Sequence, residues 1–255
     1  MDITISGQPL LAYLLAAIRI AAWLVVVPPF SSRAFPTAAK ALLALGLAFA
    51  VAPAMNDVRV PGGTVELLGL ALVQALIGAS MGFVTYLVFA AIQAAGDLVD
   101  VFGGFSLAAA FDPMSFTHNS VFGKLHQMLA TMLLFASGAH LLVIGGLLRT
   151  FDDLPVDAVP DALNLTNVVT TGFGVFFTSA VQIALPLVGV LFIADLGLAL
   201  LTRVAPQLNA IGIMFPAKIG LTLIVVGLSF PILPDAVSRL VDMAIDAMDA
   251  MAVTP

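Results

Sequence analysis

Residues 65–95 read VELLGLALVQALIGASMGFVTYLVFAAIQAA, and this apolar run decides the fold class. The run contains one acid, Glu66, and no basic residue. As a helix it would be roughly 46 Å long, whereas about 20 apolar residues are enough to cross the hydrocarbon core of a membrane. The run therefore predicts a membrane helix that tilts strongly, breaks, or projects beyond the bilayer.

The composition of the whole chain agrees with this prediction. Of the 255 residues, 61% are apolar and 9% are charged, so there are too few ionic side chains to cover a soluble globule. A soluble enzyme is largely excluded. The absence of cysteine excludes disulfides, thiolate chemistry and cysteine-ligated metals, and the formal charge of -6 argues against a nucleic-acid partner.

Five further apolar segments accompany the 65–95 run, which gives a working count of six membrane segments. They are residues 9–27, 37–53, 125–148, 168–201 and 211–233. Residues 234–251 repeat apolar side chains at helical spacing opposite acids, which predicts an amphipathic helix docked on a partner or on the protein itself. The acidic, proline-containing segment 152–167 favours a solvated turn and is the candidate domain boundary.

Three polar residues share one face at the end of the long apolar run. Gln93, Asp97 and Asp100 are spaced i, i+4 and i+7. Because a charge inside the bilayer faces water or a partner, they indicate a hydrated lining or a contact with basic residues of another subunit. The alternative is that the helix has simply left the bilayer there.

Residues 102–123, FGGFSLAAAFDPMSFTHNSVFG, form the most unusual segment. Adjacent glycines and an Asp-Pro pair disfavour a continuous helix, yet the segment is too apolar for an ordinary exposed loop. We interpret it as a constriction or plug of a pore, against the alternative of a loop that packs on neighbouring subunits. The candidate plug residues are Phe102, Gly103, Gly104, Phe105, Phe111, Asp112, Pro113, Met114 and Phe116.

Other motifs have simpler explanations than chemistry. Gly78 to Gly82 fits the nucleophile pattern G-x-S-x-G around Ser80, but the serine lies within a helical run, and a GxxxG helix contact explains the glycines. The three histidines lack metal-binding spacing, and no cofactor is predicted. Phe35-Pro36 followed by Lys40 resembles residues 215–218, FPAK, which indicates either common helix-start residues or a distant duplication.

Several blocks in fixed order resemble the FliR family of flagellar export-gate proteins, whose relatives are the SctT components of virulence injectisomes. The blocks are residues 28–36 (PPFSSRAFP), 104–106 (GFS), 111–113 (FDP), 195–209 (DLGLALLTRVAPQLN) and 215–218 (FPAK). Together they span most of the chain. The block that ends in APQLN is the most specific.

The resemblance implies an all-α membrane protein of kinked hydrophobic helices and helical hairpins. It implies a FliP-like part over residues 1–160, including the pore loop at about 102–123. A FliQ-like hairpin and the C-terminal amphipathic helix would follow over 161–255. The implied role is a non-enzymatic subunit of the type III export gate in the bacterial inner membrane and flagellar basal body. Its partners would be FliP-like and FliQ-like subunits, FlhB-like and FlhA-like export proteins, and unfolded export substrates.

The resemblance also implies roles for single residues. Residues 103–120 match the family's pore loop, and residues 203–209 match the turn that joins the last two helices. The candidate residues for that turn and for subunit contacts are Asp195, Arg203, Pro206, Gln207, Asn209 and Lys218.

Three rival functions stay open at this stage. A virulence injectisome gate is the nearest alternative. A small-solute secondary transporter would need inverted repeats around a polar midplane site. An intramembrane hydrolase would depend on Ser80.

Overall fold

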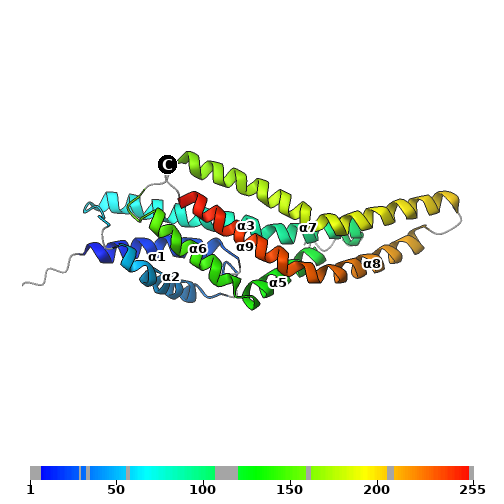
Figure 1. The fold of residues 1–255 in the computed structure, drawn as a ribbon, viewed down its shortest axis with the longest axis horizontal. Coiled ribbons are helices and arrows are strands. Elements are labelled where there is room, and N and C mark those ends of the chain that lie inside the picture. Colours follow the sequence, from blue (N-terminus) through cyan, green and yellow to red (C-terminus); the bar gives the residue numbers. More distant parts are fainter. Residues whose placement is uncertain are drawn as a thin grey trace, which may run out of the picture. The chain divides into compact units, whose positions relative to one another are not determined.

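The computed structural model describes residues 7–28, 30–32, 35–55, 58–106, 120–158, 162–205 and 210–252. Within these ranges every regular element is a helix, which confirms the predicted all-α fold class (Figure 1). The elements are α1 (Gln8–Val26), α2 (Thr37–Val51), η1 (Ala52–Met55), α3 (Thr64–Gly103), α5 (Val121–Ala136), α6 (Ala139–Asp153), α7 (Ala162–Val204), α8 (Ala210–Ser229), η2 (Phe230–Ile232) and α9 (Leu233–Ala252).

The described helices support a membrane protein, but the predicted count of six spans is wrong. By length and composition, four stretches can cross a bilayer, namely Gln8–Val26, Thr64–Gly103, Thr166–Val204 and Phe215–Ala252. The helix α2 has 15 residues and is roughly 22 Å long, which is shorter than the core of about 30 Å. The predicted fourth segment is interrupted between α5 and α6, where Gly138 has a φ of 74°, so the pair counts at most as one broken span.

The long apolar run around residues 65–95 forms one unbroken helix. The helix α3 contains 40 residues, which corresponds to roughly 60 Å, or about twice the thickness of the hydrocarbon core. Of the three outcomes that the sequence allowed, a break is therefore wrong, and the helix must tilt or project. The helix α7 is also long, with 43 residues and Pro186 inside it.

Contacts between residues divide the chain into two compact units, each built from separate segments. Unit 1 comprises residues 1–88, 137–174 and 240–255, and unit 2 comprises residues 89–136 and 175–239. A division into compact units does not show whether two parts of the chain have separate evolutionary origins. The FliP-like part (residues 1–160) and the FliQ-like part (residues 161–255) therefore stay a prediction.

In unit 1, glycines allow α3 to pack closely on α1. A methyl group at Gly78 would overlap the carbonyl oxygen of Arg19, and one at Gly82 would lie 3.1 Å from the carbonyl oxygen of Trp23. This close approach confirms the helix-packing interpretation of the two glycines. Ser80 lies inside the continuous helix between them, without the strand-to-helix turn that a nucleophile elbow requires.

The helices α1 and α2 also pack on each other in unit 1, and they are neighbours in Figure 1. The Tyr13 hydroxyl donates a hydrogen bond of 2.9 Å to the carbonyl oxygen of Leu45, which joins the two helices. The short helix α2 is therefore held by α1 although it is too short to span a bilayer.

A fully buried arginine joins three parts of unit 1. Arg19 Nε donates to Gln74 Oε1 at 2.6 Å, and Arg19 Nη1 donates to the carbonyl oxygen of Leu154 at 2.8 Å. The guanidinium carbon lies 4.3 Å from the ring centre of Phe151. Gln74 Nε2 in turn donates a hydrogen bond of 2.9 Å to the carbonyl oxygen of Val156. The segment that follows α6 is therefore held against α1 and α3.

The predicted amphipathic helix at the C-terminus is confirmed as α9. Its apolar residues Leu240, Ala244 and Met248 are buried, whereas Asp242 and Asp246 are exposed. A methyl group added at position 146 of α6 would lie 3.1 Å from the Met248 side chain. The apolar face of α9 therefore docks on the protein itself.

Candidate functional site

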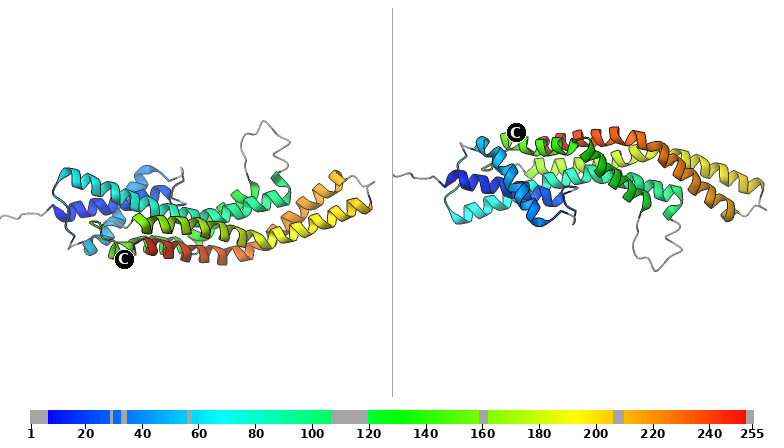
Figure 2. Two further views of the ribbon diagram at one scale, coloured as in Figure 1. Left: turned by 90° about the horizontal axis from the view of Figure 1, so that it is seen from above. Right: turned by 90° about the horizontal axis from the view of Figure 1, so that it is seen from below.

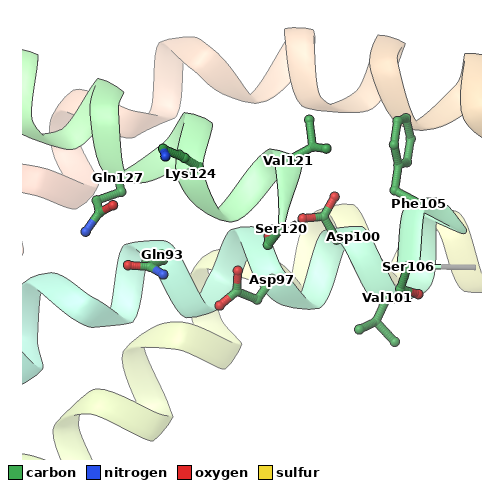
Figure 3. A pocket seen from close by; sticks show the side chains of 10 residues that line it. All are labelled: Gln93, Asp97, Asp100, Val101, Phe105, Ser106, Ser120, Val121, Lys124 and Gln127. Atoms are coloured by element: carbon green, nitrogen blue, oxygen red, sulfur yellow. Dashed lines mark hydrogen bonds between the residues drawn. The ribbon is translucent and has the colours of Figure 1, made fainter. Parts of the chain in front are cut away.

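A pocket in unit 2 has a volume of about 470 Å³ and lies between α3 and α5 (Figure 3). It brings together all three residues of the predicted polar face, and Figure 3 shows their side chains on α3 facing residues of α5. Its lining residues are Gln93, Asp97, Asp100, Val101, Phe105, Ser106, Ser120, Val121, Lys124 and Gln127.

Two glycines bring the backbones of α3 and α5 together beside this pocket. A methyl group at Gly96 would lie 2.5 Å from the carbonyl oxygen of Phe122. One at Gly123 would overlap the carboxylate oxygen Oδ1 of Asp97. At Gly96 the obstacle is backbone, so the close contact there requires glycine, whereas a side chain at position 123 would have to displace the side chains of Asp97 and Ser120.

Asp100 on α3 caps the N-terminus of α5. Its Oδ2 atom accepts hydrogen bonds from the Ser120 hydroxyl and, at 3.0 Å, from the backbone N–H of Phe122. The Ser120 oxygen also accepts a hydrogen bond of 2.8 Å from the backbone N–H of Gly123, the usual contact of an N-cap serine. Free N–H groups and the helix dipole both favour the carboxylate at this end of α5.

Two carboxylate oxygens of residues that line the pocket are buried without a hydrogen bond from the described residues. These are Oδ1 of Asp97 and Oδ1 of Asp100, and only 4% of Asp100 is exposed. On α5, the Nδ1 atom of the buried His126 forms a hydrogen bond of 2.8 Å with the carbonyl oxygen of Phe122. The pocket can therefore offer acceptors to a cationic donor.

The described plug candidates pack in an apolar cluster of unit 2. The rings of Phe105 and Phe122 meet edge to face, with their centres 4.8 Å apart. Phe102 and Phe105 also pack on a buried cluster formed by Val99, Phe122, Leu187, Leu191 and Val226. Phe111, Asp112, Pro113, Met114 and Phe116 lie outside the described residues. The plug role stays a prediction.

Gly103 and Gly104, where the predicted pore loop begins, contact α8. Gly104 has a φ of 84°, which favours glycine, and a methyl group at this position would lie 3.6 Å from the Lys218 side chain. The Thr222 hydroxyl donates to the carbonyl oxygen of Lys218 at 2.8 Å and also lies 3.4 Å from the carbonyl oxygen of Gly103. The start of the loop is thus tied to α8.

An ion pair joins α8 to α7, which run alongside each other in both views of Figure 2. Lys218 Nζ lies 2.7 Å from the Asp195 carboxylate. Arg203 is exposed in the last turn of α7, while Pro206, Gln207 and Asn209 lie outside the described residues. Of the six predicted turn residues, the structure brings together Asp195 and Lys218.

The sequence did not identify the α5 side of the pocket. Ser120 directly before the apolar helix is a helix-start signal that could have been found. Gly123 and Gln127 carry no such signal, because their role depends on which helix α5 packs against. Thr222 was also missed, as its contact with Gly103 joins residues far apart in the chain.

Known bacterial proteins are similar in sequence to this chain along most of its length. Residues 10–244 match the model of a family described as bacterial export proteins, family 1. The chain is 34% identical to the "Flagellar biosynthetic protein FliR" of Escherichia coli (strain K12) over 197 residues, which are 77% of this chain and 76% of that protein. It is 31% identical to the protein of the same name from Aquifex aeolicus (strain VF5) over 240 residues, 94% and 93% of the two chains.

A relative with a different name also matches. The "Yop proteins translocation protein T" of Yersinia pestis is 28% identical over 206 residues, 79% of each chain. The family match begins in α1 and ends within α9, so it includes both sides of the pocket.

Proposed function

Because the chain belongs to the bacterial export proteins of family 1, we propose that it is a non-enzymatic subunit of the flagellar type III protein export gate. The observation that carries this proposal is the similarity to proteins named FliR along most of the chain. The gate lies in the bacterial inner membrane and belongs to the flagellar basal body. Its clients are unfolded flagellar proteins.

Exposed apolar side chains on α7 and α8 in unit 2 support a role within an assembly. Phe177 and Ile193 of α7 are each 70% exposed, and Leu228 of α8 is 73% exposed. Apolar surface of this kind requires lipid or protein as cover. The proposed partners are FliP-like and FliQ-like subunits around a shared channel, with FlhB-like and FlhA-like export proteins beside them.

Closing the channel is the proposed role of residues 102–123. The apolar composition of the segment supports this role, because a ring of apolar side chains can close a pore by excluding water. The contacts of Gly103 and Gly104 with α8 would anchor one end, and the cap from Asp100 would anchor the other.

A virulence injectisome gate is the second candidate, because one relative is a Yop translocation protein. The identities of 34% and 30% to two proteins named FliR, against 28% to the Yop protein, favour the flagellar system.

Deletion and complementation test the proposed function. Removing the gene from its bacterium should abolish swimming and the appearance of flagellar filament protein in the medium, and the intact gene should restore both. Co-purification of the restored protein should bring down FliP-like and FliQ-like subunits. Normal swimming without the gene would contradict the proposal, and solute uptake by the isolated protein in vesicles would favour the transporter.

The sealing role has its own experiment. Residues 107–115 are replaced by a Gly-Ser linker of equal length, and ion conductance is measured across membranes that contain the assembled complex. The linker should increase the conductance, because it removes the apolar side chains and keeps the length of the chain. Unchanged conductance with an intact complex would overturn the sealing role and leave subunit membership standing.

A further inference from the structure

We propose that the pocket between α3 and α5 receives the guanidinium group of an arginine from a neighbouring subunit. This inference rests on the proposed function, which supplies the neighbouring subunit. It states which chemical group of a partner binds at one site, whereas the proposed function states that the chain belongs to the complex. The three arguments for it concern unpaired acceptors, the cations already near the pocket, and the shape of the donor.

The first argument is the pair of unpaired acceptors. Oδ1 of Asp97 and Oδ1 of Asp100 are both shielded from solvent and accept no hydrogen bond within the described part of the chain. Asp100 is also 96% buried, and its second oxygen already caps α5. Buried carboxylate oxygens are stable only when a donor or cation satisfies them, and the described residues leave these two oxygens unsatisfied.

The second argument is that the cationic side chains of the described residues near the pocket do not pair with these two carboxylate oxygens. Lys124 lines the pocket but is exposed, and it forms no ion pair with either acid in the described residues. Lys218 is already paired with Asp195. His126 uses its Nδ1 for the Phe122 carbonyl. A single ammonium group at the edge also leaves two carboxylates with excess negative charge.

The third argument is the match between the pocket and a planar donor. Figure 3 shows Asp97 and Asp100 on α3, with Gln127 and Lys124 on α5. A guanidinium carries five N–H donors in a fixed fork and can contact two carboxylates and an amide oxygen together. Val101 and Val121 supply apolar lining for the methylene stem of an arginine. An ammonium has three donors, and a divalent cation seeks six or more oxygens in a closed shell.

Removing the charge without removing the acceptors tests the inference. In the double variant Asp97→Asn and Asp100→Asn, the amide oxygen of residue 100 can still cap α5. The variant should reduce the recovery of the partner subunit by at least about tenfold in co-purification, on the scale of a lost buried charge pair. The matched control is Asp152→Asn with Asp153→Asn, which removes two exposed acids from α6 and should leave recovery unchanged.

Photocrosslinking identifies what occupies the pocket. A photoreactive amino acid replaces Gln127 in the full complex, and the adducts are mapped by mass spectrometry. The expected adduct is a peptide of another subunit with an arginine within one helical turn of the linked residue. Its yield should fall in the double Asn variant. Adducts to lipid alone, a linked site without a nearby arginine, or partner recovery that instead requires added Mg²⁺ would overturn the inference.

The two proposals fail in different ways. If the wild-type chain restores export and binds its partners while the double Asn variant does so equally well, the arginine is rejected and the proposed function stands. If the wild-type chain co-purifies with no other subunit, both are overturned. Circular dichroism of the double Asn variant should show unchanged helix content, and a loss of helix would contradict the premise that asparagine preserves the cap.

Discussion

Asp100 on α3 accepts a hydrogen bond of 3.0 Å from the backbone N–H of Phe122, twenty-two residues later in the chain. The bond holds the start of α5 beside the end of α3. It does so with one oxygen of a carboxylate that is 4% exposed. The same side chain therefore has a structural contact through one oxygen, while its other oxygen is buried and accepts no hydrogen bond from the described residues.

Replacing Asp100 by alanine should destabilise α5. The change removes a charged acceptor from Phe122 and from the Ser120 hydroxyl, and the expected loss is about 1.5–3 kcal/mol. Asp100→Asn should lose less, because its amide oxygen can accept the same bonds. Thermal unfolding of the purified protein in detergent measures both. Equal losses in the two variants would show that the charge, and not the cap, carries the stability.

Gly78→Ala should be strongly destabilising, while Gly69→Ala should be harmless. Both glycines lie on α3, but a methyl group at Gly78 would overlap the Arg19 carbonyl oxygen, and nothing lies within 4 Å of one at Gly69. Overpacking costs about 1–3 kcal/mol, whereas alanine in an open helix position gains about 0.5–1 kcal/mol over glycine. Protein accumulation in membranes and thermal unfolding distinguish the two variants. A tolerated Gly78→Ala would mean that α1 can move away.

Lys218 and Asp195 should contribute only modestly to stability. Both residues lie in stretches that can cross a bilayer, and their side chains are 19% and 37% exposed. For the purified protein in detergent, where water reaches the exposed part and screens the pair, a double-mutant cycle with Lys218→Met and Asp195→Asn should give less than about 1 kcal/mol. The exchanged pair, Lys218→Asp with Asp195→Lys, should recover most of the stability that either substitution alone removes. A coupling several times larger would mean that the pair is buried by a partner in the measured state.

The sequence was sufficient to predict that the fold consists of helices, but it was not sufficient to predict where each helix ends. Apolar runs near 20 residues made an all-α membrane protein the simplest prediction. The break at Gly138 depends on a left-handed backbone, and such a glycine cannot be told from one in an ordinary helix by composition. The count of six spans failed for that reason, and because α2 ends after 15 residues.

The same contrast applies to the pocket. Helical spacing placed Gln93, Asp97 and Asp100 on one face, and all three line the pocket. The residues opposite them follow from the close contact of Gly96 with α5. That contact is tertiary, and no periodicity within either helix indicates it. A helix-start signal at Ser120 was the one available clue to the other side.

Arg19→Met should be the most damaging single change among these predictions. The methionine keeps an apolar stem but leaves Gln74 and the carbonyl oxygen of Leu154 without their donors, at a site with no access to water. Breaking a buried charged network of this kind costs about 3–5 kcal/mol. Arg19→Lys should recover little of the lost stability, because one ammonium group cannot bond both the Gln74 side chain and the backbone after α6 as the guanidinium does.

Limited proteolysis near residues 154–158 should become faster in both variants, because the chain there loses its anchor. The matched control is Arg149→Met, which removes an exposed arginine from α6 and should leave the cleavage rate unchanged. If Arg19→Met were cleaved at the wild-type rate, the buried arginine would not hold that segment.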